Sequence, residues 1–157
     1  KVKHRPPYLL RRWSYETPGF RVEIYDDLTY TYSMNIFAKK HTREQSQTGN
    51  TAVHVIRDIF TGSNLKIEKI IFFGSRARGD YNNDSDWDFL VISRQELPTR
   101  EKHRLISRIK RQLAKLNIPN DIIIQSRHKF ESQKKFPGNI SYVANLEGML
   151  AWLRLRI

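Results

Sequence analysis

Apolar and polar positions divide the chain into a short β-rich N-terminal part and a longer part with mixed helix and strand periods. From Arg21 to Met34, apolar residues recur at alternate positions on either side of Asp26-Asp27, which predicts a β-hairpin. The polar segment 38–50 ends in Gly-Asn and is interpreted as a linker that leads into a helix. We therefore divide the chain into an N-terminal extension, residues 1–50, and a domain, residues 51–157.

The second part alternates between the helical and the extended period. The predicted elements are a helix from Thr51 (N-cap) to Gly62 (C-cap), strands at 66–73 and 86–93, an amphipathic helix at 98–117, a strand at 120–126 and a last helix at 141–155 with Gly148 inside it. Helix 98–117 places Leu105, Ile109, Leu113 and Leu116 on one face. Alternating helices and strands of this kind predict an α/β domain whose strands are buried on both faces.

The composition of the chain excludes several kinds of site. The chain has no cysteine, so it cannot form disulfides, zinc-thiolate sites or a thiol nucleophile. It contains no apolar run of transmembrane length and no signal-peptide pattern, so we expect a cytoplasmic protein without a membrane partner. The formal net charge is +12, which suits either an anionic partner or a well-solvated surface rich in lysine and arginine.

The run from Phe72 to Val91, FFGSRARGDYNNDSDWDFLV, is the most informative stretch. Its two glycines have P-loop spacing, but Asp80-Tyr81 stand where a P-loop needs Lys and then Ser or Thr. A calcium loop would need a glycine at Ser85 and a glutamate at Val91, so this alternative also fails. A polar turn between two strands explains residues 80–85, but it leaves the Asp86-x-Asp88 pair unexplained.

Two carboxylates separated by one residue project from the same side of a strand. Asp86 and Asp88 would repel each other there unless a cation lies between them, and they form a natural ligand pair for magnesium. Upstream, Gly74-Ser75 follows a strand, where free backbone N–H groups and a hydroxyl bind phosphate. A phosphate cradle followed by a metal-binding pair contains the parts needed for phosphoryl or nucleotidyl transfer.

The spacing of Gly74-Ser75, ten residues and Asp86-x-Asp88 resembles the signature of the DNA polymerase beta-like nucleotidyltransferase superfamily. The fuller run is similar to its small stand-alone members, the minimal nucleotidyltransferases (MNT), some of which are antitoxins paired with HEPN toxins. The similarity extends from about Thr51 to Leu153 and includes Glu147-Gly148 near the end. Residues 1–50 have no counterpart in it; we expect a genuine appendage that caps a sheet edge, the alternative being residues upstream of a native start at Met34.

The resemblance implies the nucleotidyltransferase fold, a small mixed sheet flanked by helices, and a metal-dependent transfer of AMP from ATP to an acceptor hydroxyl. It implies that Asp86 and Asp88 hold two Mg²⁺ ions, with Asp121 completing the metal site and acting on the proton of the attacking hydroxyl. The expected acceptor is a HEPN-type toxin protein, with RNA as a weaker possibility. The alternatives are a non-catalytic module that neutralises a toxin or RNA, and an adenylyltransferase acting on an antibiotic.

Other residues keep two interpretations each. Arg76 and Arg78 follow the cradle and could bind the triphosphate, or they could be solvated residues of a turn. A basic stripe, defined as Arg104, Arg108, Arg111 and Lys115, is either a solvated helix face or a docking surface for an acidic protein or RNA. Trp87 projects opposite to the two aspartates and is expected in the core, the alternative being stacking on a nucleotide base.

Overall fold

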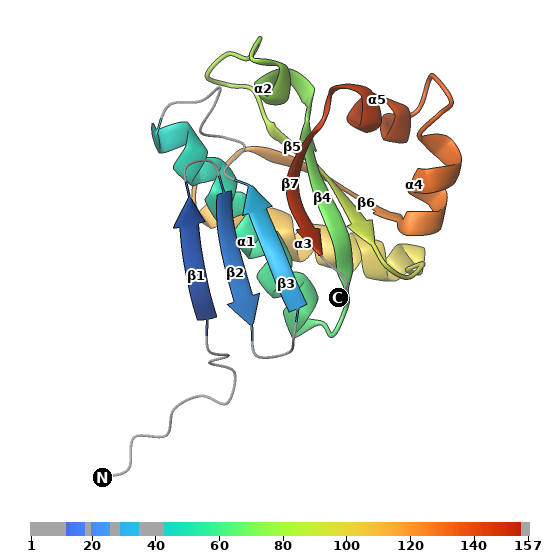
Figure 1. The fold of residues 1–157 in the computed structure, drawn as a ribbon. Helices are drawn as coiled ribbons and strands as arrows, with labels where there is room; N and C mark the ends of the chain where they lie inside the picture. Colours follow the sequence, from blue (N-terminus) through green and yellow to red (C-terminus); the bar gives the residue numbers. More distant parts are fainter. Residues whose placement is uncertain (1–11, 18–19, 26–28, 35–42, 155–157) are drawn as a thin grey trace.

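The structure, a computed structural model, describes residues 12–17, 20–25, 29–34 and 43–154 (Figure 1). Within these residues the strands and helices follow the order β1 (Arg12–Thr17), β2 (Phe20–Tyr25), β3 (Thr29–Met34), α1 (Arg43–Gly62), β4 (Ile67–Phe73), α2 (Gly74–Arg78), β5 (Trp87–Ser93), α3 (Thr99–Lys115), β6 (Asn120–Ser126), α4 (Arg127–Gln133), α5 (Ile140–Glu147) and β7 (Met149–Arg154).

All of these strands belong to one sheet, in the order β1-β2-β3-β7-β4-β5-β6. Strand β4 pairs antiparallel with β7 and with β5, whereas β5 and β6 are parallel and are joined through α3. The sheet is therefore mixed, as expected, and the predicted strands β4, β5 and β6 are confirmed. The expected α/β class is also confirmed.

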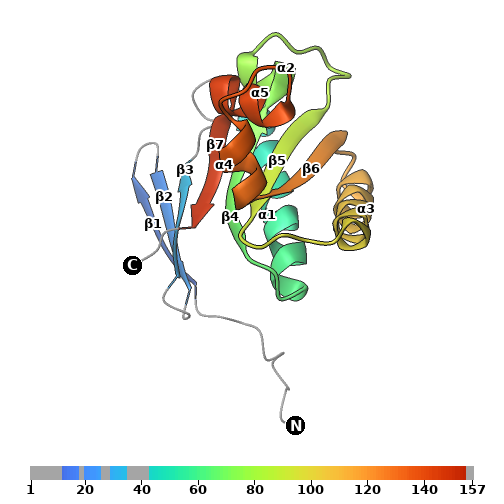
Figure 2. The ribbon, with the colours of Figure 1, turned by 90° about the vertical axis from the view of Figure 1, so that its right-hand side faces the viewer.

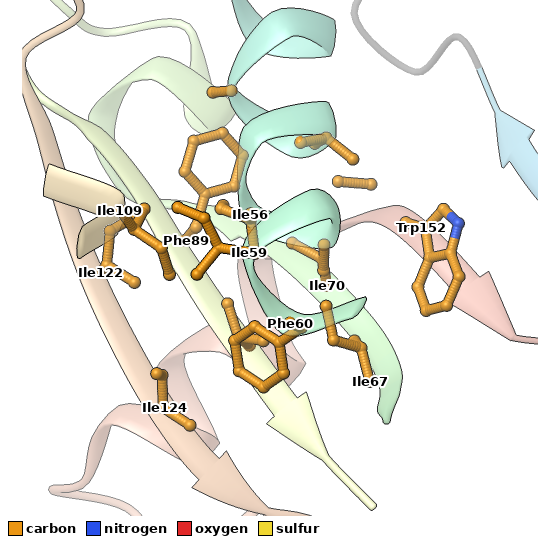
Figure 3. Packing of buried hydrophobic residues seen from close by; sticks show 14 of the residues in the cluster. Ile56, Ile59, Phe60, Ile67, Ile70, Phe89, Ile109, Ile122, Ile124 and Trp152 are labelled. Atoms are coloured by element: carbon orange, nitrogen blue, oxygen red, sulfur yellow. The ribbon is translucent and has the colours of Figure 1, made fainter. Parts of the chain in front are cut away.

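Helices cover both faces of the central strands (Figures 1 and 2). Helices α1 and α3 pack on one face, where Ile56, Phe60 and Ile109 meet β-strand residues such as Phe89 in the larger core (Figure 3). Helices α4 and α5 supply Phe130 and Ala144 to a smaller core on the opposite face. Nearly every residue of β5 is buried because the strand lies between these two cores, which agrees with its unbroken apolar run.

The predicted N-terminal hairpin is present. Strands β2 and β3 pair antiparallel from Phe20↔Met34 to Tyr25↔Thr29, and the expected turn at Asp26-Asp27 lies outside the described residues. Strand β1, which the sequence did not indicate, pairs with β2, and β3 pairs with β7. The meander β1–β3 thus continues the sheet beyond β7.

Helix α1 begins earlier than predicted. It starts at Arg43, so the second half of the predicted linker is helical and the proposed domain boundary at 50/51 falls inside the helix. Thr51 is not an N-cap, because its hydroxyl donates to the Gln47 carbonyl within the helix. From Glu44 to Asn50 the buried residues are Ser46 and Gly49, so no apolar period marks these turns of the helix. The division into an extension and a domain stays a prediction.

The predicted last helix is wrong over its second half. Helix α5 ends at Glu147, and the following residues form β7, which pairs with β4. Gly148 has extended angles, φ −75° and ψ 152°, and an added Cβ would lie 2.2 Å from the Ala144 carbonyl oxygen and 2.4 Å from Ile71 Cγ2. The chain therefore turns from helix to strand at a residue that must lack a side chain.

The amphipathic helix α3 is confirmed with one correction. Leu105, Ile109 and Leu113 are buried, but the helix ends at Lys115, so the side chain of Leu116 leaves the apolar face and is half exposed. Among the described helices, none combines the length and the apolar character needed to cross a membrane.

Candidate active site

The predicted phosphate cradle lies where β4 ends and α2 begins. Gly74 has a φ of +79°, a left-handed conformation that lets the chain turn from the strand directly into the five-residue helix. Gly79 ends this helix with a φ of +93°, and its N–H donates to the Ser75 carbonyl. Gly74 and Ser75 remain partly exposed, so a ligand could reach their backbone.

Asp88 lies directly against this cradle. It pairs with Phe73 across β4 and β5, and an added Cβ on Gly74 would lie 2.0 Å from the Asp88 Oδ2 atom. Residue 74 must therefore be glycine because the Asp88 carboxylate occupies the space that a side chain would need. The sequence did not reveal this reason. Asp86 precedes the first residue of β5 and is exposed.

The predicted third carboxylate is brought to the same place by the parallel pairing of β5 and β6. Asp121 is the register partner of Asp88. Its Oδ1 accepts a hydrogen bond from Lys110 Nζ at 3.0 Å, and both side chains are about half exposed. Lys110 comes from α3, which packs on the face of the sheet opposite to Asp88. Its side chain can pass around the edge of the sheet to Asp121 because β6 is the last strand.

The charges of Asp86 and Asp121 act on Asp88. Partial burial raises the pKa of Asp88 from 3.8 to about 6, and the negative charges of Asp121 and Asp86 add to this rise. Arg78 and Arg76 oppose it only weakly. Three carboxylates thus lie close enough to act on one another, although the whole chain is basic.

The three aspartates offer carboxylate oxygens to a divalent ion. Among the residues that the structure describes, no three acidic, histidine or cysteine side chains converge as a ready-made ligand shell. The donor set nevertheless fits magnesium, because carboxylate oxygens are its preferred ligands and a cation would relieve the repulsion at Asp88. Lys110 bonds one oxygen of Asp121, Oδ1, so the other carboxylate oxygen could join such a shell.

The two arginines after the cradle differ from each other. Arg78 is exposed, and it bonds to Asp80 and to Glu147 on α5, the latter at 2.7 Å. Arg76 is buried, with 6% of its surface exposed, so it is not the solvated turn residue that one interpretation expected. Triphosphate binding by either side chain stays a prediction.

Two residues near the site make contacts that the sequence did not predict. Lys110 is one of several basic residues on α3, and only the strand order shows that it meets Asp121. Glu147 belongs to the family resemblance, and the fold adds its bond to Arg78, which joins α2 to α5. Trp87 is buried, as predicted, and stacks on Phe72 with ring centroids 5.3 Å apart.

The raised pKa of Asp88 predicts a pH-dependent stability. Between pH 3.8 and about 6 the folded protein binds more protons at this group than the unfolded chain, so the free energy of unfolding falls as the pH rises. Asp88→Asn mimics the protonated form. We expect it to stabilise the metal-free protein by about 1 kcal/mol at pH 7.5, after allowance for solvent screening, and by almost nothing near pH 4.

Urea denaturation in the presence of a chelator at both pH values measures this difference. Asp84→Asn is the matched control, because Asp84 is exposed in the preceding turn, and it should change stability little at either pH. An Asp88→Asn variant that is less stable than wild type at pH 7.5 would contradict the assignment of a repulsive site.

Comparison with known proteins agrees with this geometry. The family model described as "Polymerase beta, Nucleotidyltransferase" matches residues 55–136, just over half of the chain, and these include the cradle and all three aspartates. A relative from Methanocaldococcus jannaschii, provisionally named as a protein adenylyltransferase, is 41% identical over 63 residues, or 40% of this chain. The match spans 63% of that relative's length. The chain belongs to the polymerase beta nucleotidyltransferase family.

Proposed function

We propose that the protein transfers AMP from ATP to a hydroxyl group of an acceptor protein. The observation that carries the proposal is the contact of the Asp88 carboxylate with Gly74, with Asp121 on the neighbouring strand. This arrangement places acidic ligands beside backbone N–H groups suited to phosphate. The relative named as a protein adenylyltransferase supports the choice of AMP and of a protein acceptor.

Each residue has a separate task in this proposal. Gly74 and Ser75 bind the triphosphate through backbone N–H groups and the serine hydroxyl. Two Mg²⁺ ions, held by Asp86 and Asp88 and one of them also by Asp121, would supply charge neutralisation at the phosphates. Asp121 receives or orients the proton of the attacking hydroxyl.

The reaction conserves all atoms and charges. The acceptor oxygen forms a bond to the α-phosphorus while the bond from that phosphorus to the β-phosphate oxygen breaks. Pyrophosphate leaves, AMP stays on the acceptor and one proton is released. The side chains of this chain contribute positioning and electrostatic stabilisation rather than a covalent intermediate.

The proposed acceptor is a partner protein of the HEPN toxin class, as the resemblance to MNT antitoxins implies. The basic stripe offers a surface for it. All four residues of the stripe are exposed on α3, on the opposite side of the sheet from Asp88 and the smaller core. Docking there would leave the carboxylates accessible, and exposed charges of one sign favour a partner of the opposite sign.

The same stripe favours a second candidate function, which is stoichiometric capture of a toxin or RNA without chemistry. Arg111 and Lys115 form no ion pair among the described residues, so their charges are available to an anionic partner. Such binding should weaken as salt rises, because exposed charges are screened within about 10 Å at 0.1 M. When the partner is a toxin, transfer leaves AMP on it, whereas capture leaves it unmodified.

A transfer assay separates them. The full chain is incubated with Mg²⁺, ATP labelled at the α-phosphate and a candidate HEPN-type partner, and the products are analysed by intact-mass spectrometry. We expect label and the mass of one AMP on the partner, with pyrophosphate released in equal amount. A partner that is neutralised but unmodified would favour capture, and label on a small antibiotic instead would exclude the protein acceptor while retaining the chemistry.

A further inference from the structure

Arg76 is held inside the protein by contacts with the turn that precedes β5. Its Nε donates to the Ser85 carbonyl at 2.8 Å, and its Nη2 donates to the Asn83 carbonyl at 3.3 Å. Only 6% of its surface is exposed. A buried guanidinium is costly unless its donors are matched, so these bonds fix the side chain in one position. Its forked donors point at backbone oxygens of its own chain.

Two aromatic rings hold the guanidinium as well. Its central carbon lies 4.9 Å from the centroid of Tyr81 and 5.0 Å from that of Trp87. Tyr81 is itself fixed, since its hydroxyl donates to Gln45 of α1 at 2.8 Å. Arginine is attracted to aromatic faces most strongly where water is excluded. The two hydrogen bonds and the two ring contacts therefore join α2, the turn and the first residue of β5.

These contacts lie on both sides of Asp86 in the chain. The Ser85 carbonyl belongs to the same peptide unit as the Asp86 N–H, and Trp87 is the next residue. On the same short helix, Gly74 contacts the Asp88 carboxylate. Helix α2 thus constrains Asp86 through Arg76 and Asp88 through Gly74, which couples the phosphate cradle mechanically to both carboxylates.

We propose that Arg76 is a positioning residue that sets the placement of Asp86 and Asp88 and does not contact the nucleotide. This inference rests on the proposed function, and it replaces the expectation that Arg76 binds the triphosphate. Partners that orient metal ligands typically change metal affinity 10–100-fold when they are removed. A lysine cannot replace Arg76, because it has neither the planar fork nor the stacking surface.

The test uses the full chain carrying Arg76→Lys or Arg76→Met, with Mn²⁺ as the metal probe. We expect both variants to bind Mn²⁺ at least about tenfold more weakly than wild type in calorimetry. We also expect backbone amides from residue 82 to 87 to exchange hydrogen faster. ATP affinity without metal should fall much less than Mn²⁺ affinity, because the residue is not in contact with phosphate.

Leu105→Ala is the matched control for lost stability. Leu105 is fully buried in α3, away from the site, so the variant should melt at a lower temperature but keep wild-type Mn²⁺ affinity and amide exchange at 82–87. All assays are run below the melting temperature of every variant.

The outcomes separate this inference from the function on which it rests. An Arg76→Lys variant that keeps wild-type Mn²⁺ affinity but loses ATP affinity would show a phosphate contact and overturn the positioning role. Failure of the wild type to bind Mn²⁺ would instead overturn the proposed function. The exchange measurement still decides on Arg76 in that case, since unchanged exchange at 82–87 in both variants refutes the role.

Discussion

Asp86→Asn and Asp88→Asn should each reduce nucleotidyl transfer at least about a thousandfold while leaving the protein folded. An amide keeps the size of the side chain but removes the negative charge that a divalent ion requires. Loss of a metal ligand removes stabilisation of charge that develops in the transition state, for which a loss of about 4 kcal/mol corresponds to this factor. Asp88 is the stronger test, because it contacts the cradle and is in register with Asp121.

The measurement is single-turnover transfer of labelled AMP with saturating Mg²⁺ and acceptor. Circular dichroism and melting curves confirm that each variant is folded, and Asp84→Asn is the control for a change of charge in the preceding turn. Either aspartate variant retaining near-normal transfer would refute the assignment of these two carboxylates to the metal site. Rescue by Mn²⁺ alone would indicate weakened rather than lost binding.

Gly74→Val should lower triphosphate affinity at least about tenfold and transfer at least about a hundredfold. A valine Cβ would lie 2.0 Å from the Asp88 Oδ2 atom, and the residue has a φ of +79°, which branched side chains rarely adopt. The Asp88 carboxylate must therefore move, and the cradle with it. A displacement of about 1 Å at such a site is enough to cost a hundredfold in rate.

Gly138→Val separates displacement of Asp88 from simple backbone strain. Gly138 also has a positive φ, +90°, but an added Cβ there meets nothing within 4 Å. We expect it to lower the melting temperature while leaving ATP binding, measured by calorimetry, and transfer close to wild type. If Gly74→Val binds ATP as tightly as wild type, Gly74 does not belong to the phosphate site.

The order of apolar and polar residues along the chain was sufficient to predict the strands and the helix that position the candidate site. Strands β4, β5 and β6 each contain a short run of consecutive apolar residues, as expected for strands covered on both faces. Helix α3 repeats its apolar residues at helical spacing. The spacing from Gly74-Ser75 to Asp86-x-Asp88 identified the family, because glycine freedom and paired carboxylates have specific physical uses. The hairpin β2–β3 was visible in its alternation of apolar and polar residues.

Other features depended on contacts between distant segments. Residues 149–154 are apolar enough for either a helix or a strand, and pairing with β4 together with the crowded position of Gly148 selects the strand. The parallel register of β5 and β6 brings Asp121 beside Asp88, and the edge position of β6 admits Lys110. A one-dimensional pattern contains no information on register or on which strand lies at an edge.

Arg76 and Arg78 show most clearly what the sequence determined and what the tertiary structure decided. They are chemically identical and two residues apart, yet one is buried between Tyr81 and Trp87 and the other is exposed and bonded to Glu147. The sequence specified that two cations follow the cradle. Their different surroundings arise only when the turn folds back over α2 and α5 packs beside it, because burial and hydrogen-bond partners are properties of the assembled structure.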